Sequence, residues 1–181
     1  MNNSERKEVI LVDTSDLEIG RMEKLEAHQK GLLHRAFSVF VFNRSNQLLL
    51  QRRAMGKYHS EDLWTNTCCS HPEPGESITD AAKRRLMEEM GFTCELHTSF
   101  SFIYHVALDN GLEEHELDHI VFGISDETPV LNPVEASDYT WKTLDEIRIE
   151  MAEFPEKYTS WFKIILNEHF EQLSDALKLI V

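Results

Sequence analysis

WTNTCCSHPEPGESITDAAKRRLMEEMG, residues 64–91, is the stretch that determines the fold. It begins with a short β-like run that ends in two cysteines, and a loop rich in proline and glycine follows at residues 72–75. The remainder predicts a helix over residues 77–90. Ser77 and Asp80 have the three-residue spacing of an N-terminal cap, and Gly91 stands where a left-handed C-terminal cap is easiest for glycine.

The predicted helix carries two charged residues at its apolar face. At about 100° per residue, Ile78, Ala82 and Leu86 form an apolar stripe. Glu89 falls within this stripe and Arg85 lies beside it. A carboxylate that faces a core costs free energy unless it is paired, hydrogen-bonded or bound to a metal. Two interpretations remain open: an ion pair at the helix edge, or a glutamate that holds a cation beside an arginine that meets an anion.

The same stretch resembles the Nudix box, G-x5-E-x7-R-E-U-x-E-E-x-G-U, in which U is a bulky apolar residue and which folds as loop, helix and loop. The matching residues are Glu76, Arg84, Leu86, Glu88, Glu89, Gly91 and Phe92. Ser70 replaces the first glycine, and Arg85 replaces the first glutamate of the R-E pair. Nudix hydrolases use that glutamate in binding the metals that drive diphosphate cleavage, so its replacement argues against hydrolysis.

Arginine at position 85, together with TNTCCSHP at residues 65–72, resembles the type 1 isopentenyl-diphosphate isomerases, and the likeness extends from about Lys24 to Trp161. It implies an α/β (α+β) fold, a Nudix-like mixed β-sheet sandwiched between helices. The implied enzyme interconverts isopentenyl diphosphate and dimethylallyl diphosphate in isoprenoid biosynthesis. One alternative is a Nudix-type diphosphate hydrolase, in which Glu76, Glu88 and Glu89 bind metals that activate water. Another is a non-enzymatic metal- or nucleotide-binding module.

The composition is that of a soluble globular protein. With 41% hydrophobic and 28% charged residues, the chain predicts one domain over residues 1–181. Residues 1–35 are expected to be an N-terminal metal-binding extension and residues 155–181 a C-terminal helical segment. The polar start and the lack of a long apolar run predict a cytoplasmic protein outside membranes. Three cysteines, two of them adjacent, predict reduced thiols.

The charge distribution bears on the choice of partners. A net charge of −14 argues against general binding to nucleic acid or to an anionic membrane. Residues 1–85 hold 13 basic and 12 acidic side chains, whereas residues 86–181 hold 5 and 20. An anionic small molecule is therefore expected to bind to residues 1–85. No extended apolar stripe exceeds what one core uses, so a monomer is expected rather than a homodimer.

Predicted strands and helices alternate along the rest of the chain. Strands are predicted at residues 8–13, 36–42, 47–53, 93–106, 113–124 and 138–142, with turns at 43–46 and 109–111. The segments 36–42 and 47–53 are expected to pair as a hairpin. Residues 22–34 read as a polar connector or short helix. Thr143 and Glu146 predict the cap of a short helix before Pro155, and residues 159–180 read as helical.

Histidines and glutamates form a candidate metal site. Glu114 and Glu116 are two residues apart on a predicted strand, so both carboxylates share a face and can reach one ion. The resemblance implies that His28, His34, His71, Glu114 and Glu116 bind one divalent metal, Mn²⁺, Zn²⁺ or Mg²⁺. Imidazoles with carboxylates suit a borderline divalent cation. The remaining histidines are expected at the surface or in the core: His59, His97, His105, His115, His119 and His169.

Basic residues form a candidate anion site. Guanidinium groups match phosphate oxygens in a bidentate way, and lysine adds a point charge. By resemblance, Lys24, Arg53, Lys57 and Arg85 contact the substrate diphosphate. Glu89 matches the ligand of a Mg²⁺ ion that reaches the protein partly through the phosphates. From the residues alone, a solvated basic face is the alternative.

The implied reaction needs two proton carriers. Moving the double bond of the five-carbon diphosphate requires a proton added at C4 and one removed at C2, through a tertiary carbocation in a dry site. The resemblance implies that Cys69 and Glu116 carry these protons, with Tyr104 beside Glu116. Trp161 matches an aromatic residue that faces the cation, and its alternative role is core packing. Cys68 points away from Cys69 on a strand and is expected to be a buried apolar residue.

Overall fold

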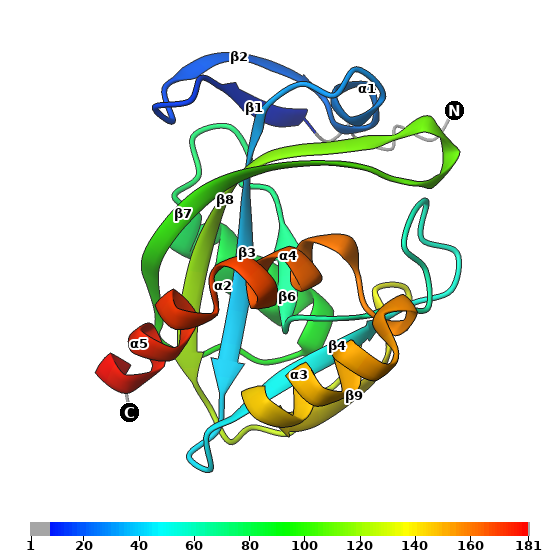
Figure 1. The fold of residues 1–181 in the computed structure, drawn as a ribbon. Coiled ribbons are helices and arrows are strands. Elements are labelled where there is room, and N and C mark those ends of the chain that lie inside the picture. The colour runs from blue at the N-terminus through cyan, green and yellow to red at the C-terminus, as the bar shows by residue number, and fades with distance from the viewer. Residues whose placement is uncertain (1–7, 181) are drawn as a thin grey trace.

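The computed structural model describes residues 8–180 (Figure 1). In this range nine strands belong to one mixed sheet. The strands are β1 (Glu8–Val12), β2 (Glu18–Glu23), β3 (His34–Phe42), β4 (Gln47–Arg53), β5 (Trp64–Thr65), β6 (Cys68–Ser70), β7 (Leu96–Ala107), β8 (Glu113–Ile124) and β9 (Ala136–Thr143). The helices are α1 (Lys24–Gln29), α2 (Ile78–Met90), α3 (Leu144–Glu153), α4 (Ser160–Glu168) and α5 (Phe170–Ile180), with 3₁₀ turns η1 (Asp109–Gly111) and η2 (Pro155–Lys157).

Strand β3 lies at the centre of the sheet. It pairs in parallel with β8, from His34 opposite Glu116 to Phe42 opposite Ile124. Its antiparallel neighbours include β1 and β6. Parallel neighbours need a long connection, and residues 43–112 provide it here. This pairing brings His34 and Glu116, which are far apart in the sequence, onto adjacent strands.

The predicted hairpin between residues 36–42 and 47–53 forms only at its turn. Strand β4 pairs with β3 at Phe42 opposite Leu48. Over its whole length β4 pairs instead with β9, from Gln47 opposite Thr143 to Arg53 opposite Ala136. Strand β6 pairs with the middle of β3 in its place. The cysteine strand is therefore positioned directly by the central strand of the sheet.

The side chains of β3 alternate between two hydrophobic clusters. Phe37, Val39 and Val41 pack with apolar residues of α2 on one face of the sheet. Phe40 and Phe42 pack with apolar residues of α3, α4 and α5 on the other face. Figure 1 shows α4 in front of the sheet and α2 behind it. Since each large buried apolar side chain contributes about 1.5–3 kcal/mol, these two layers hold the mixed sheet between helices and confirm the expected fold class.

Helix α2 begins and ends where the sequence predicts. The N–H of Asp80 donates to Ser77 Oγ at 3.1 Å, and Gly91 ends the helix with a φ of 75°. A Cβ atom at position 91 would lie 2.4 Å from the carbonyl oxygen of Val130, so glycine is required for this close approach. The capping box predicted for α3 is also present.

Two local features differ from the prediction. Residues 18–23 form strand β2, whose side chains are mostly exposed. It forms because β1 supplies backbone hydrogen bonds, although its apolar pattern is too weak to predict a strand. The C-terminal helical segment is divided into α4 and α5 because the backbone at His169 leaves the helical conformation. Between residues 8 and 180, no helix is long and apolar enough to cross a membrane.

Candidate active site

One cavity collects almost all of the predicted site residues. Its lining side chains come from α1, α2, α4, β3, β4, β6, β7 and β8, from the loop between β4 and β5, and from the segments that follow β6 and precede β9. Every residue predicted for catalysis, substrate binding or metal binding lines it, except His34. The His34 ring is fully buried beside the rings of His28 and His71. The site therefore depends on the whole fold rather than on one element.

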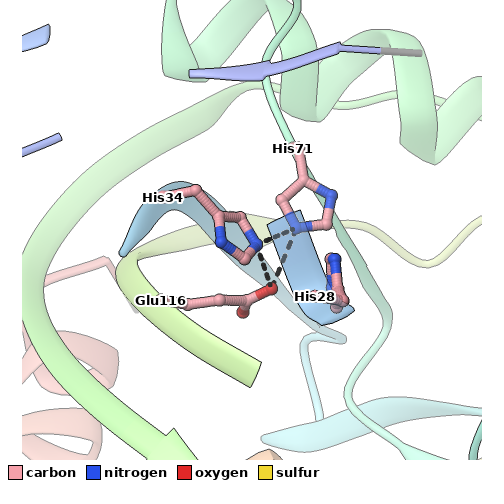
Figure 2. A group of neighbouring side chains, drawn as sticks. All are labelled: His28, His34, His71 and Glu116. Atoms are coloured by element: carbon pink, nitrogen blue, oxygen red, sulfur yellow. Dashed lines mark hydrogen bonds and ion pairs between the residues drawn. The ribbon is translucent and has the colours of Figure 1, made fainter. Parts of the chain in front are cut away.

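Four of the predicted metal ligands converge, as Figure 2 shows. His28, His34, His71 and Glu116 each offer one ligand atom, and these atoms lie within 4.8 Å of one another. His28 and His34 each have Nδ1 at 2.7 Å from a backbone carbonyl oxygen. Because a carbonyl oxygen only accepts, each Nδ1 carries the proton and each Nε2 keeps a lone pair for a metal.

These ligand atoms lie close enough to one another to bind a single cation. Nε2 of His71 lies 3.2 Å from Nε2 of His34 and 2.9 Å from Oε1 of Glu116. Burial lowers the pKa of His28 to about 4 and that of His71 to about 3, so both rings are neutral at neutral pH, as metal binding requires. Burial opposes the charge of Glu116, but its close contacts with the rings of His34 and His71 hold its pKa well below the usual range. Three imidazoles and a carboxylate fit a divalent cation.

Glu114, the fifth predicted ligand, lies at the edge of this group. Its Oε2 accepts a hydrogen bond from the Tyr104 hydroxyl at 3.1 Å. Its Oε1 lies 3.8 Å from Nε2 of His59. Burial, together with the charge of Glu116, raises the pKa of Glu114 well above its usual value. Glu114 thus belongs to a second group, with His28 and His59, that overlaps the first.

The two adjacent cysteines of β6 face opposite ways. Cys69 lines the cavity, whereas Cys68 is fully buried in the hydrophobic cluster against α2. Burial raises the pKa of the Cys69 thiol well above its usual value, so it keeps its proton at neutral pH. Glu116 lines the same cavity, and its Oε2 accepts a hydrogen bond from the Tyr104 hydroxyl at 2.6 Å. A thiol and a carboxylate–phenol pair therefore share one cavity.

Cationic side chains line another part of the cavity. Lys57 pairs with Glu135. Nη2 of Arg85 lies 3.0 Å from Oε1 of Glu135 and 2.7 Å from Oε1 of Glu89. The Nε–H of Arg85 is buried and finds no hydrogen-bond partner within residues 8–180. The ion pair between Arg85 and Glu89 is therefore present, and the arginine keeps one donor without a partner in this range. The interpretation in which Glu89 holds a cation and Arg85 meets an anion stays a prediction.

Arg53 links these cations to the loop between β4 and β5. Its Nε donates to the Ser60 carbonyl at 3.0 Å and its Nη2 to the His59 carbonyl at 3.1 Å. The guanidinium carbon lies 5.2 Å from the centre of the Trp161 ring. The buried indole of Trp161 donates from Nε1 to Asn66 Oδ1 at 3.3 Å. This ring already contacts one cation through its face, which is the interaction that a carbocation would use.

The other carboxylates of the Nudix box are paired with arginine. Glu76 accepts two hydrogen bonds from Arg84, at 2.7 and 2.8 Å. Oε2 of Glu88 lies 2.5 Å from Nη1 of Arg85. Neither Glu76 nor Glu88 lines the cavity. The carboxylates that a hydrolase would use for metal binding are thus neutralised by arginines here.

Among the cavity residues that were not predicted as site residues are one histidine and one glutamate. His59, which was expected at the surface or in the core, lines the cavity beside Glu114. The available signal was its position two residues after Lys57 in the chain. Glu135 had no assigned role, yet it contacts both Lys57 and Arg85. No local pattern marks Glu135, because its partners are far away in the sequence.

Known proteins resemble this chain over most of its length. The NUDIX domain family model matches residues 32–162. The isopentenyl-diphosphate Delta-isomerase of Pectobacterium atrosepticum is 55% identical over 157 residues, which cover 87% of this chain and 88% of that protein. The isopentenyl-diphosphate Delta-isomerase 2 of Aromatoleum aromaticum is 53% identical over 160 residues, which cover 88% and 85%.

Solved structures with low sequence identity share the fold. The MutT protein of Methanosarcina mazei superposes with a TM-score of 0.64 at 19% identity, covering 78% of this chain and 95% of that one. A NUDIX hydrolase of Nitrosomonas europaea gives 0.54 at 21% identity, covering 75% and 87%. Fold and sequence agree, and the chain belongs to the isopentenyl-diphosphate Delta-isomerase family within the NUDIX domain proteins.

Proposed function

We propose that this chain is an isomerase that interconverts isopentenyl diphosphate and dimethylallyl diphosphate in isoprenoid biosynthesis. One observation carries the proposal: a single cavity combines a buried thiol, a buried carboxylate–phenol pair and a group of cations. The relatives at 55% and 53% identity bear the name of that activity. A thiol and a carboxylate can move protons, and the cations can hold a diphosphate.

Cys69 and Glu116 are the proposed catalytic residues. One of them gives a proton to C4 of isopentenyl diphosphate, whose double-bond electrons form the new C–H bond and leave a tertiary carbocation. The other takes a proton from C2, and those C–H electrons form the double bond of dimethylallyl diphosphate. The raised pKa of Cys69 supports the thiol as a proton carrier. Tyr104, 2.6 Å from Glu116, is placed to orient or relay a proton.

The carbocation requires protection from water, which would trap it. Trp161 is the proposed residue that faces the cation, because its ring is buried in the cavity wall and already contacts the Arg53 guanidinium. The face of an aromatic ring attracts positive charge but does not react with a carbocation as a nucleophile. Trp161 would therefore stabilise the intermediate while it excludes solvent.

We assign His28, His34, His71, Glu114 and Glu116 to one divalent metal, Mn²⁺, Zn²⁺ or Mg²⁺. The convergent Nε2 lone pairs support this assignment. A bound cation of this kind would make a proton on a coordinated carboxyl more acidic. The chain's own contribution is to hold the rings of His28 and His34 through their Nδ1–H groups and to keep the carboxylates on adjacent positions of one face of β8.

Lys24, Arg53, Lys57 and Arg85 are the proposed diphosphate contacts, and Glu89 is the proposed ligand of an accompanying Mg²⁺ ion. The buried Nε–H of Arg85 that lacks a partner in residues 8–180 supports this proposal, because a phosphate oxygen would satisfy it. By holding the diphosphate at one end of the cavity, these residues would place the hydrocarbon part between the two proton carriers.

Further features of the protein are also proposals. We infer a cytoplasmic monomer that binds neither nucleic acid nor membranes, on the basis of its net charge of −14 and its ordinary core. Residues 1–181 would act as one domain, in which 1–35 supply two metal-binding histidines and 155–181 supply Trp161. Residues 1–7 and 181 lie outside the described range.

Incubation with isopentenyl diphosphate and Mg²⁺ in D₂O tests the reaction. The expected product is acid-labile dimethylallyl diphosphate that contains deuterium from the solvent, without phosphate release. Phosphate release without the isomer would overturn the proposal in favour of a Nudix-type hydrolase. If neither the isomer nor free phosphate is formed, the proposal is overturned in favour of a metal- or nucleotide-binding module.

A further inference from the structure

We infer that His59 is a positioning residue that holds Glu114 in place for the metal centre. This inference rests on the metal site proposed above. His59 lies in the loop between β4 and β5, and its Nε2 lies 3.8 Å from Oε1 of Glu114. Only 5% of each side chain is exposed. Polar groups buried to this extent need a partner, and the ring and the carboxyl lie close to each other, although 3.8 Å is longer than a hydrogen bond.

The loop between β4 and β5 is arranged to bring this ring into the cavity. Arg53 donates hydrogen bonds to the carbonyl oxygens of His59 and Ser60. Ser60 has a φ of 48°, a left-handed conformation that costs free energy for a residue other than glycine. The His59 ring is enclosed by His28 and Trp161, whose ring centres lie 6.2 and 6.0 Å away. Its position is therefore determined by contacts on several sides.

The contact between the His59 ring and Ser60 is compatible with a proton on Nε2. Nδ1 of the ring lies 3.2 Å from the Ser60 hydroxyl, which can donate to it and leave the ring proton on Nε2. That Nε2–H then faces the carboxylate of Glu114. His28 and His34 have the opposite arrangement, with Nδ1 bonded to a carbonyl and a lone pair on Nε2. A histidine that donates to a metal-binding carboxylate orients it from outside the ligand set.

The Zn²⁺ affinity of the full-length chain, measured by competition with a chelating dye, tests this role. His59→Phe keeps a ring but removes the donor, and it is expected to weaken Zn²⁺ binding about 10- to 100-fold. His59→Gln retains an N–H donor and is expected to bind within about fivefold of the wild type. His119→Phe is the matched control, because His119 also faces a carboxylate, Asp16 at 3.1 Å, but outside the cavity. Its affinity should not change.

X-ray absorption of the Zn²⁺-loaded proteins separates positioning from ligation. The expected result is the same number of imidazole ligands in the wild type and in His59→Gln. One imidazole fewer in the variant would make His59 a ligand and overturn the inference. A folded His59→Phe protein with affinity within about twofold of the wild type would overturn it too. If His59→Phe does not fold, His59→Leu takes its place with the same expectation.

The metal measurement also separates this inference from the proposed function. A wild-type protein that binds Zn²⁺ but does not isomerise its substrate would contradict the function alone. A wild-type protein that binds no Zn²⁺ would overturn the role of His59, because no metal centre would exist for it to support.

Discussion

Replacing Cys69 with alanine removes a proposed proton carrier and leaves the rest of the cavity in place. The backbone pairing of β6 with β3 does not use the thiol. Cys68 offers a matched control, since it is the same residue type on the same strand but faces the cluster against α2. Comparing the two single alanine variants therefore separates proton transfer from packing.

The expected loss follows from what the thiol contributes. Removing a positioned proton donor or acceptor lowers a rate by about 10²- to 10⁴-fold. At about 1.4 kcal/mol per factor of ten, this is a loss of about 2.8–5.6 kcal/mol of transition-state stabilisation. Cys68→Ala removes one buried sulfur atom instead. It should cost about 1 kcal/mol of unfolding free energy and leave kcat within about threefold of the wild type.

Turnover is measured as dimethylallyl diphosphate formed at saturating substrate, and binding of inorganic pyrophosphate with Mg²⁺ by calorimetry. Cys69→Ala should lose turnover but keep its pyrophosphate affinity within about twofold, because the proposed contacts to the diphosphate are elsewhere. A Cys69→Ala protein that retained more than about a tenth of the wild-type kcat would refute the reasoning. So would a folded Cys68→Ala protein that lost as much activity as Cys69→Ala.

Removal of divalent metal by a chelator should lower the thermal midpoint, because an ion present at about 100 times its Kd stabilises the folded state by about 2.7 kcal/mol. Scanning fluorimetry with and without Zn²⁺ measures this shift, and an unchanged midpoint would contradict the metal assignment. Gly91→Ala should lower the unfolding free energy in urea by more than about 1 kcal/mol, since φ is 75° and the new Cβ would lie 2.4 Å from the Val130 carbonyl oxygen. If the variant had the same unfolding free energy as the wild type, the backbone near Val130 would accommodate the new Cβ atom without cost, and this account would be wrong. Burial opposes the charge of Glu135, but the hydrogen bond from Lys57 and the charge of Arg85 lower its pKa to about 2. Because the folded pKa lies below the unfolded one, this stabilisation is complete above about pH 5 and is lost as the pH falls toward 2. Glu135→Gln should therefore flatten the pH dependence of the unfolding free energy in that window, and a curve parallel to that of the wild type would refute this account.

The sequence alone allowed the local elements of the site to be predicted. Ser77 and Gly91 mark the ends of α2 because caps depend on residues within one turn. The strand over residues 113–124 and the opposite orientation of Cys68 and Cys69 follow from the two-residue period of a strand. The residues proposed for the site came from the family resemblance, and all of them except His34 line one cavity.

Tertiary structure decided which of these local pieces meet. The parallel pairing of β3 with β8 places His34 opposite Glu116, and the pairing of β4 with β9 replaces the expected hairpin. His59 and Glu135 enter the cavity only because a loop and a distant segment fold over it. Caps and strand periodicity are properties of neighbouring residues, whereas these contacts join residues that are remote in the chain. These long-range contacts stabilise the protein only once the two hydrophobic clusters have formed around the sheet. No local pattern in the sequence therefore predicts them.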